Sequence, residues 1–413
     1  MRARACPAAP DGVGMGARAQ GPGIEREAWT VDDAAATDGL QVDAILSRIR
    51  AWVEIETPTG HIDGINALMD HASAEYEAIG GVLERIPGRD GQGDHVSIRL
   101  PWTGRADPDA PGILVLSHLD TVHPVGTIAE ALPFRVEDGR AWGPGIADMK
   151  GGAAMALAAL EALHRAGADT PLPVRVLLTS DEEIGSPTSE GLIRAAAREA
   201  AYVLCTEPAR NGGKAVTARK GVGRYGLEAK GRAAHSGGNH QDGRSAIAEL
   251  ARKVVEIEER TDYARGMTFN VGRIWGGTTD NTVPERAGCR IDLRVETEED
   301  AAEADAWLRS LRPENPDVTL TLEGGLNRPP FAKSNAIAAL FEHARGLAEE
   351  IGFSLEDMAS GGGSDASFVA RDTAVLDGIG IEGALMHTHG EHVMVDSIVP
   401  RTRLFMRLFE TLR

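Results

Sequence analysis

Apolar residues recur at helical spacing in two segments near the start of the chain, Val42–Glu54 and Ile65–Ala78, and this period predicts amphipathic helices. A third segment, 149–167, is rich in Ala and Leu and also predicts a helix. Short apolar runs with the length of buried strands lie at 112–117, 174–180 and 202–206. Strands that alternate with helices predict a largely parallel sheet that helices bury on both faces.

The pattern changes near Gly212, where the strands begin to alternate polar and apolar residues. Two amphipathic helices, at about 242–260 and 299–311, lie between these strands. The resulting β-α-β-β-α-β order predicts a two-layer α+β domain of ferredoxin-like type, with one face of its sheet in contact with solvent. The helix-rich α/β pattern returns after residues 327–331, so the small domain is predicted to be inserted into the large one.

We therefore expect a large α/β domain from residues 37–212 and 327–413 and an inserted domain from residues 213–326. Because a chain of 413 residues exceeds the usual size of one hydrophobic core, its length agrees with this division. Residues 1–36 are expected to form a disordered extension, in which Met15 is an alternative start.

Net charge and cysteine content limit the classes of partner and the cellular compartment that suit this protein. A formal net charge of −19 argues against binding to nucleic acid or to an anionic membrane, since such surfaces concentrate Lys and Arg. The three cysteines show no CxxC spacing, which indicates neither a disulfide framework nor a thiolate zinc site and suits a reducing cytoplasm. No apolar run is long enough to span a bilayer. We therefore expect a cytoplasmic protein.

Side chains that can bind metal ions follow the predicted strands. His118 and Asp120 lie two residues apart, so both point the same way in an extended segment. Asp148 stands between a loop rich in Gly and Pro and the start of a helix, and Glu207 follows a strand and precedes a proline. The strand at 174–180 runs into three acids, Asp181, Glu182 and Glu183, and a motif far downstream offers His387, His389 and His392.

Three adjacent carboxylates at the end of a buried strand repel one another unless a cation or hydrogen-bond donors compensate. Imidazole and carboxylate without thiolate match zinc bound by nitrogen and oxygen, although such ligands also accept manganese or cobalt. One carboxylate can bridge two ions about 3.5–4 Å apart, which can activate water for attack on a carbonyl group. Of Glu182 and Glu183, one can bind metal while the other acts as a general base.

Each motif also has a simpler explanation when taken alone. The pair His118 and Asp120 can be a surface or helix-capping pair, and the three acids can be a solvated helix start. Glu207 can be an ordinary turn residue, and the histidine motif can be a surface loop. Their coincidence at the strand ends of one sheet favours a metal site, because ligand sites of such sheets lie beyond the carboxyl ends of the strands.

These residues, in this order, resemble the di-zinc metallohydrolase family of glutamate carboxypeptidase, aminoacylase, acetylornithine deacetylase and succinyl-diaminopimelate desuccinylase, which is peptidase family M20. The similarity covers residues from about 40 to 413. It implies two zinc ions per subunit. The implied ligands are His118 and Glu207 for one ion, Asp148 for both, and Glu183 and His387 for the other, with His389 as the alternative to His387.

The same resemblance assigns roles to neighbouring residues. Asp120 would orient His118, and Glu182 would be the general base that takes a proton from water and passes it to the leaving amine. In this family the carboxypeptidases and deacylases have Glu at the position of residue 207, whereas the aminopeptidase and tripeptidase branches tend to have Asp. The Glu207 of this chain therefore disfavours an aminopeptidase.

The inserted domain is similar to the dimerisation or lid domain of the family and implies a homodimer. His235 would reach across the dimer to the scissile carbonyl group, although a lone His can also be structural. Asn281 and Arg294 fall where relatives bind the carboxylate or carbonyl group of the substrate, and Arg328 is a further carboxylate ligand. Gly362 lies in a glycine loop that can approach a ligand closely or simply cap a helix.

We therefore predict a zinc-dependent carboxypeptidase that releases a C-terminal amino acid, glutamate in the first place, from an N-acyl or peptide conjugate. The first alternative is an N-acyl amino acid deacylase of the acetylornithine deacetylase or aminoacylase type, because both activities use the same catalytic residues. The second is a catalytically silent binding protein of the same fold, which is expected to lack a metal ligand or the base. All of these residues are present in this chain.

Overall fold

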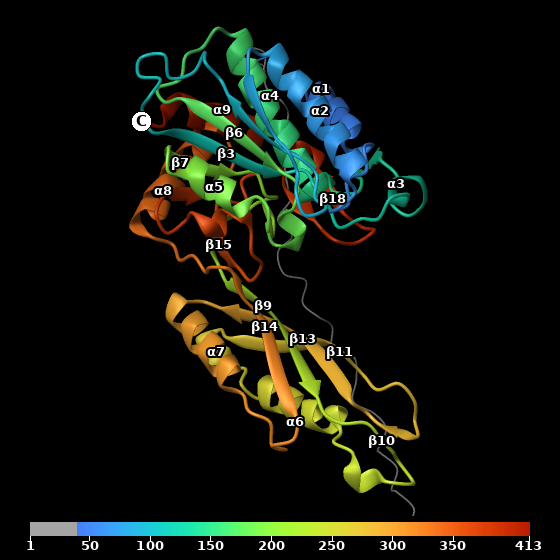
Figure 1. Cartoon of the computed structure of the whole chain (residues 1–413). Coiled ribbons are helices and arrows are strands. Elements are labelled where there is room, and N and C mark those ends of the chain that lie inside the picture. Colours follow the sequence, from blue (N-terminus) through green and yellow to red (C-terminus); the bar gives the residue numbers. More distant parts are fainter. Residues whose placement is uncertain (1–38) are drawn as a thin grey trace, which may run out of the picture. The chain divides into compact units, whose positions relative to one another are not determined.

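The computed structural model describes residues 39–413, and the predictions made for residues 1–36 lie outside the described residues. A six-stranded sheet has the order β1-β2-β6-β3-β7-β16 (Figure 1). Its strands are β1 (Val82–Ile86), β2 (His95–Arg99), β3 (Gly112–His118), β6 (Val174–Thr179), β7 (Ala200–Cys205) and β16 (Ala374–Leu376). The four strands β6, β3, β7 and β16 are parallel to one another, whereas β1 pairs with β2, and β2 with β6, in the antiparallel sense. The predicted, mostly parallel sheet is confirmed.

Alternating side chains bury both faces of this sheet. On β3, Ile113 and Val115 join the hydrophobic cluster formed by helices on one face, while Leu114 and Leu116 join the cluster on the other. The helices of the first cluster are α1 (Val42–Val53), α2 (Ile62–Ala78), α4 (Gly151–Arg165), α8 (Asn335–Ile351) and α9 (Ile398–Thr411). Helix α5 (Glu190–Ala197) contributes Ile193 to the second. Each such buried side chain stabilises the fold by about 1.5–3 kcal/mol.

A second sheet of four antiparallel strands has its own hydrophobic cluster. Its order is β11 (Thr268–Gly276), β13 (Arg286–Val295), β9 (Gly221–Lys230) and β14 (Thr319–Arg328). Helices α6 (Ala246–Glu258) and α7 (Glu298–Ser310) supply Leu250 and Leu308 to this cluster. The intervening residues of β9, such as Arg224 and Glu228, are exposed, so no helix of residues 39–413 covers the other face. The order of these elements is the β-α-β-β-α-β order expected from the sequence, and the domain boundaries stay a prediction.

Shorter elements connect and flank these two sheets. They are α3 (Thr127–Glu130), β4 (Arg135–Glu137), β5 (Arg140–Trp142), β8 (Ala215–Arg219), β10 (Ala234–His235), β12 (Thr282–Val283), β15 (Asp357–Ser360), β17 (Gly383–Ala384) and β18 (His392–Met394). Strand β18 pairs with β5, which brings the C-terminal histidine motif beside the loop that precedes α4. No helix in residues 39–413 is both long and apolar enough to cross a bilayer.

The three central strands place their carboxyl ends at one edge of the six-stranded sheet. His118 is the last residue of β3, Glu182 and Glu183 lie in a helical turn just after β6, and Glu207 follows β7. Because β6, β3 and β7 are adjacent and parallel, the segments that follow them meet at this edge. The fold thus gathers residues that are far apart in the sequence.

Candidate metal centre

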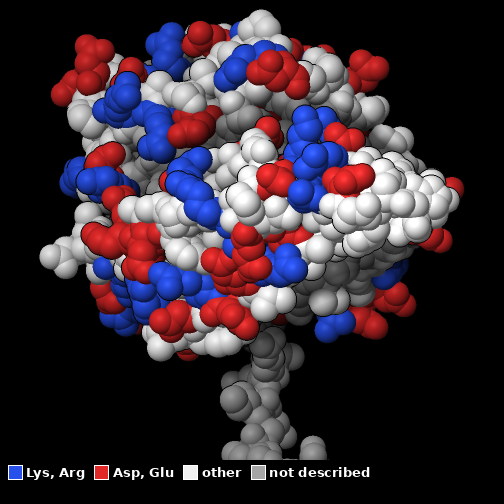
Figure 2. All heavy atoms as spheres, turned by 60° about the horizontal axis from the view of Figure 1, so that its bottom comes forward, with Lys and Arg blue, Asp and Glu red and all other residues white. Residues whose placement is uncertain are grey.

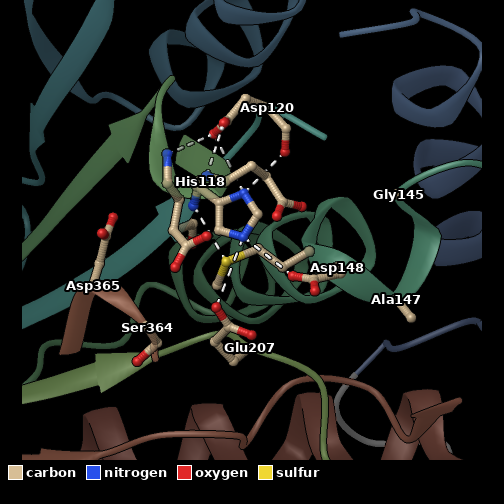
Figure 3. Close-up of polar contacts among 12 residues, drawn as sticks. His118, Asp120, Gly145, Ala147, Asp148, Glu207, Ser364 and Asp365 are labelled. Carbon is tan, nitrogen blue, oxygen red and sulfur yellow. Dashed lines mark hydrogen bonds and ion pairs between the residues drawn. The ribbon is translucent and has the colours of Figure 1, made fainter. Parts of the chain in front are cut away.

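The imidazole of His118 is held in one orientation by its own loop. Its Nδ1 lies 2.9 Å from the carbonyl oxygen of Asp120. Since a carbonyl oxygen only accepts hydrogen bonds, Nδ1 carries a proton and Nε2 faces the cluster. This Nε2 lies 3.2 Å from Asp148 Oδ1 and 3.7 Å from Glu207 Oε1. Figure 3 shows the ring between Asp120 on one side and Glu207 on the other.

A second group of ligand atoms shares Asp148 with the first. His387 Nε2 lies 3.3 Å from Asp148 Oδ2 and 3.3 Å from Glu183 Oε2. Within each group, the three ligand atoms all lie within 4.8 Å of one another. Asp148 therefore turns one oxygen toward each group, which is the arrangement of a carboxylate that bridges two cations. His387 has a positive φ of 62°, an uncommon conformation for a residue other than glycine.

Burial makes this collection of charges unfavourable without a cation. It raises the pKa of Glu183 to about 8, and the charges of Asp148 and Glu182 add to this effect. Burial and the charge of Asp148 also raise the pKa of Glu207 well above its usual value. Glu183 Oε1 is buried and has no hydrogen-bond partner among residues 39–413. The donor set and this orphaned oxygen fit divalent cations, which would offset the repulsion.

The protonation of His118 follows from the same charges. Burial alone would lower its pKa, but hydrogen bonds with Asp120 and Asp148 outweigh burial and raise the pKa well above the usual value. Burial likewise opposes ionisation of Asp148, whereas hydrogen bonds with His118 and His387 lower its pKa. A cation in either group would replace a proton on imidazole, since metal binding requires the deprotonated ligand.

The carboxylate of Asp120 fixes the acidic turn after β6. It accepts hydrogen bonds from Thr59 Oγ1 at 2.7 Å and from the amides of Glu182 and Glu183 at 3.1 and 3.2 Å. Its nearer oxygen lies 3.5 Å from His118 Nδ1. Asp120 thus sets the position of the two glutamates relative to His118. The expected role of Asp120 in orienting His118 stays a prediction.

Glu182 lies outside the two ligand groups and contacts a guanidinium. Arg328 Nη2 lies 2.8 Å from Glu182 Oε1, and Arg328 Nη1 lies 2.9 Å from Asp365 Oδ1. Burial raises the pKa of Glu182, while the charge of Arg328 opposes this rise. A carboxylate with a raised pKa beside a cation site can take up and release a proton.

Asp181, the first of the three adjacent acids, belongs to the scaffold. Its carboxylate accepts hydrogen bonds from the amide and hydroxyl of Thr188 at 2.6 and 2.7 Å. It also accepts bonds from the amide and hydroxyl of Ser189 at 3.3 and 2.5 Å. These donors compensate its buried charge and hold the start of α5 beside the site.

Glu391 supports the loop that carries Asp148 and did not stand out in the sequence. Its carboxylate accepts hydrogen bonds from the amides of Ala147 and Asp148 at 2.9 and 3.1 Å, and it lies 2.6 Å from His123 Nε2. The local signal was its place between His389 and His392 in the histidine motif.

Gly362 lies in a loop that a buried ion pair fixes, and no local sequence pattern predicted that pair. Arg219 and Asp377 are fully buried, with Arg219 Nε 2.7 Å from Asp377 Oδ2. Arg219 Nη1 donates to the carbonyl oxygens of Gly362 and Gly363, each at 3.1 Å. Ser364 Oγ donates to Asp377 at 2.7 Å instead of capping the following turn.

Other predicted site residues lie apart from the ligand groups. His235 accepts hydrogen bonds from the amides of Gly237 and Gly238, and its segment contacts Asn281 through the backbone of Ser236. Neither His235 nor Asn281 belongs to the two ligand groups found in residues 39–413.

Arg294 forms an ion pair with Asp292 at 2.7 Å and donates to the carbonyl oxygen of Gly361. The two remaining histidines of the C-terminal motif do not enter either ligand group. His389 is exposed, and His392 stacks against Trp142 with ring centres 5.8 Å apart. The functional roles proposed for Arg294 and for the residues of the ligand groups stay predictions.

Two potential cation sites at the strand ends of an α/β sheet, beside a carboxylate with a raised pKa, define a metallohydrolase. Residues 114–411 match the family described as peptidase family M20/M25/M40, and the chain belongs to this family. The family resemblance expected from the sequence is confirmed.

Individual relatives agree with this assignment. The chain is 31% identical over 378 residues to carboxypeptidase G2 of Pseudomonas sp. (strain RS-16), covering 90% of this chain and 89% of that protein. It is 28% identical over 344 residues to acetylornithine deacetylase of Myxococcus xanthus, which covers 80% of this chain and 88% of that protein. The crystal structure of a tripeptidase from Staphylococcus aureus subsp. aureus Mu50 superposes with a TM-score of 0.73 at 19% sequence identity. The match covers 90% of this chain and 98% of that chain and shows that the two share a fold.

We predict that Glu391→Ala weakens zinc binding about 10–100-fold, because the Asp148 loop loses the acceptor for its amides. The zinc dissociation constant, measured by competition with a chelator, tests this prediction, and circular dichroism checks the fold. Glu137→Ala, an exposed acid on β4, is the control and is expected to bind zinc normally. Unchanged zinc affinity in Glu391→Ala would show that the loop keeps its shape without this carboxylate.

Proposed function

We propose that this protein releases a C-terminal amino acid, glutamate in the first place, from an N-acyl or peptide conjugate. Family membership makes it a metal-dependent hydrolase of amide bonds, of carboxypeptidase or deacylase type. The observation that carries the proposal is Asp148, which faces both ligand groups, with Glu182 and its partner Arg328 beside them. Water activation and carboxylate recognition would thus meet at one place.

The proposed ligands of two zinc ions per subunit are the two groups that share Asp148, and manganese or cobalt would suit the same donors. When bound, such ions lower the pKa of water and polarise a carbonyl group. Glu182 would take the proton of the attacking water and deliver it to the leaving amine. Its burial supports this role, because a raised pKa lets the same carboxylate both accept and donate a proton at neutral pH.

Recognition of the leaving amino acid would fall to the arginines. Arg328 and Arg294 offer planar guanidinium groups that can bind a carboxylate with two hydrogen bonds. The backbone near Gly362 and the amide of Asn281 would add further contacts. His235 of a partner subunit would donate to the developing oxyanion. This would explain why His235 belongs to neither ligand group within residues 39–413.

A homodimer through the inserted domain is supported by exposed apolar side chains. Strand β11 is an edge strand of its sheet, and its Ile274 is 59% exposed. On α6, Ile247 and Val255 are 42% and 55% exposed. An unpaired strand edge next to apolar residues favours association with a second copy. The proposed bounds of this inserted domain are residues 213–326. Residues 37–212 and 327–413 would form the catalytic domain. We also propose that the protein is located in the cytoplasm.

We predict that the zinc-loaded protein hydrolyses acyl-glutamate conjugates and peptides ending in glutamate faster than N-acetyl-ornithine and other simple N-acetyl amino acids. Values of kcat/KM on the two sets test this prediction. The opposite preference would move the protein to the deacylase type with its metal chemistry unchanged. Hydrolysis of neither set by protein with bound zinc would contradict the proposed substrate class.

We predict that Glu182→Ala keeps its metal ions but loses nearly all turnover, whereas Glu183→Ala loses metal as well. Glu182 lies outside both ligand groups, while Glu183 supplies an oxygen to one of them. Metal content and kcat, measured on the same preparations, separate the two effects. Full activity in Glu182→Ala would contradict its role as the general base.

We predict that Ile274→Glu converts the dimer to a monomer, because a charge on this edge would be buried without a partner. Analytical ultracentrifugation at several protein concentrations measures the change. Val136→Glu is the matched control, since Val136 is 51% exposed on β4 and lies outside the inserted domain. A monomeric wild-type protein, or an unchanged dimer in Ile274→Glu, would refute this interface.

A further inference from the structure

Three arginines gather where the second sheet meets the turn that carries Glu182. Arg294 on β13 and Arg328 on β14 both lie opposite Val222 of β9, and Arg224 is two residues further along β9. Arg224 Nη1 donates to the carbonyl oxygen of Ile184 at 2.6 Å, and Arg328 Nη2 donates to the carbonyl oxygen of Glu182 at 2.9 Å. Two guanidinium groups therefore contact the same short turn, Glu182–Ile184.

These arginines differ in how their charge is compensated. Arg328 has two carboxylate partners, and Arg294 donates to both oxygens of Asp292, at 2.7 and 3.0 Å. For Arg224, no carboxylate of residues 39–413 lies within ion-pair distance, and its hydrogen bond goes to a backbone oxygen. By contrast, Lys and Arg side chains lie among Asp and Glu side chains on the face shown in Figure 2. Among these three arginines, Arg224 is thus the one that has no carboxylate partner of its own within residues 39–413.

The surroundings of Arg224 strengthen this argument. Burial and the charge of Arg328 lower the pKa of Arg224, and Arg294 acts in the same direction, while the charges of Glu182 and Asp292 oppose this shift. Arg224 is nevertheless partly open to solvent, on the sheet face that no helix of residues 39–413 covers. A like-charged group of this kind is stabilised by a bound anion, and a guanidinium favours a carboxylate because of its planar donor geometry.

We propose that Arg224 binds the side-chain carboxylate of the released amino acid, while Arg328 and Arg294 bind its α-carboxylate. This inference rests on the proposed function and narrows it, because the substrate becomes an amide of an acidic amino acid. A neutral residue of the same shape would leave the charge of Arg224 without a partner. A site built to bind a charged group discriminates strongly against such an analogue.

The competing explanation is purely structural. The hydrogen bond to Ile184 could serve only to fasten β9 to the acidic turn. In that case the loss of Arg224 would disturb Glu182 and Glu183, and kcat/KM would fall by the same factor for all substrates. A comparison of two substrates that differ only in side-chain charge separates the explanations.

The experiment measures kcat/KM of the zinc-loaded full chain on a pair of substrates with one acyl group, acyl-glutamate and acyl-glutamine. Wild-type protein is expected to prefer glutamate. Arg224→Met is expected to lower kcat/KM on glutamate about 10–100-fold more than on glutamine, with the loss mainly in KM. Arg224→Lys, which keeps the charge, is expected to restore part of the preference.

The matched control is Arg290→Met. Arg290 lies on the same face of the sheet as Arg224, with its side chain over Gly226, but further from the turn Glu182–Ile184. Its substitution is expected to leave kcat/KM unchanged for both substrates. Equal losses on both substrates in Arg224→Met, or no preference in the wild-type protein, would overturn this inference alone. Hydrolysis of neither amide by the wild-type protein would overturn the proposed function and this inference with it.

Discussion

Electrostatic repulsion between buried carboxylates governs how the metal centre of this protein is built. Asp148, Glu183 and Glu207 are brought together by segments that follow different strands, and each is largely shielded from water. Moving such charges out of water costs several kcal/mol for each ion unless opposite charge compensates. The two histidines of the ligand groups offset part of this cost, and divalent cations would offset the rest.

Several structural features keep the ligand atoms in place. The adjacent parallel strands β6, β3 and β7 bring the ligands to one edge, and buried carboxylates then fix the loops between them. Asp120 holds the amides of Glu182 and Glu183, and Glu391 holds the amide of Asp148. In both cases a carboxylate that is not in a ligand group binds the backbone beside a ligand. The geometry of the site therefore rests on charge-assisted hydrogen bonds as much as on the ligands.

Much of the fold followed from local patterns. Helices α1, α2, α4, α6 and α7 and strands β3, β6 and β7 fall where apolar periodicity or short apolar runs predicted them, because their apolar side chains pack into the hydrophobic clusters. The ligand groups were also accessible to prediction, since each member lies at a strand end or in a distinctive motif. The family resemblance already favoured His387 over His389, and within residues 39–413 it is His387 that lies beside Asp148 and Glu183.

The parts that the sequence did not predict depend on contacts between distant positions. Arg219 and Asp377 are 158 residues apart, and His123 and Glu391 are 268 residues apart, so no local pattern marks either pair. The lack of a carboxylate partner for Arg224 within residues 39–413 was missed for the same reason, since it is visible only in three dimensions.

The number of zinc ions that the metal-free protein binds, measured by calorimetric titration with metal analysis of the saturated protein, tests whether Asp148 serves both ligand groups. We predict two ions per chain in the wild-type protein. We also predict that Asp148→Ala loses high-affinity binding of both ions, because one carboxylate serves both groups. Saturation at a single ion, or two tightly bound ions in Asp148→Ala, would contradict the central role of a shared carboxylate.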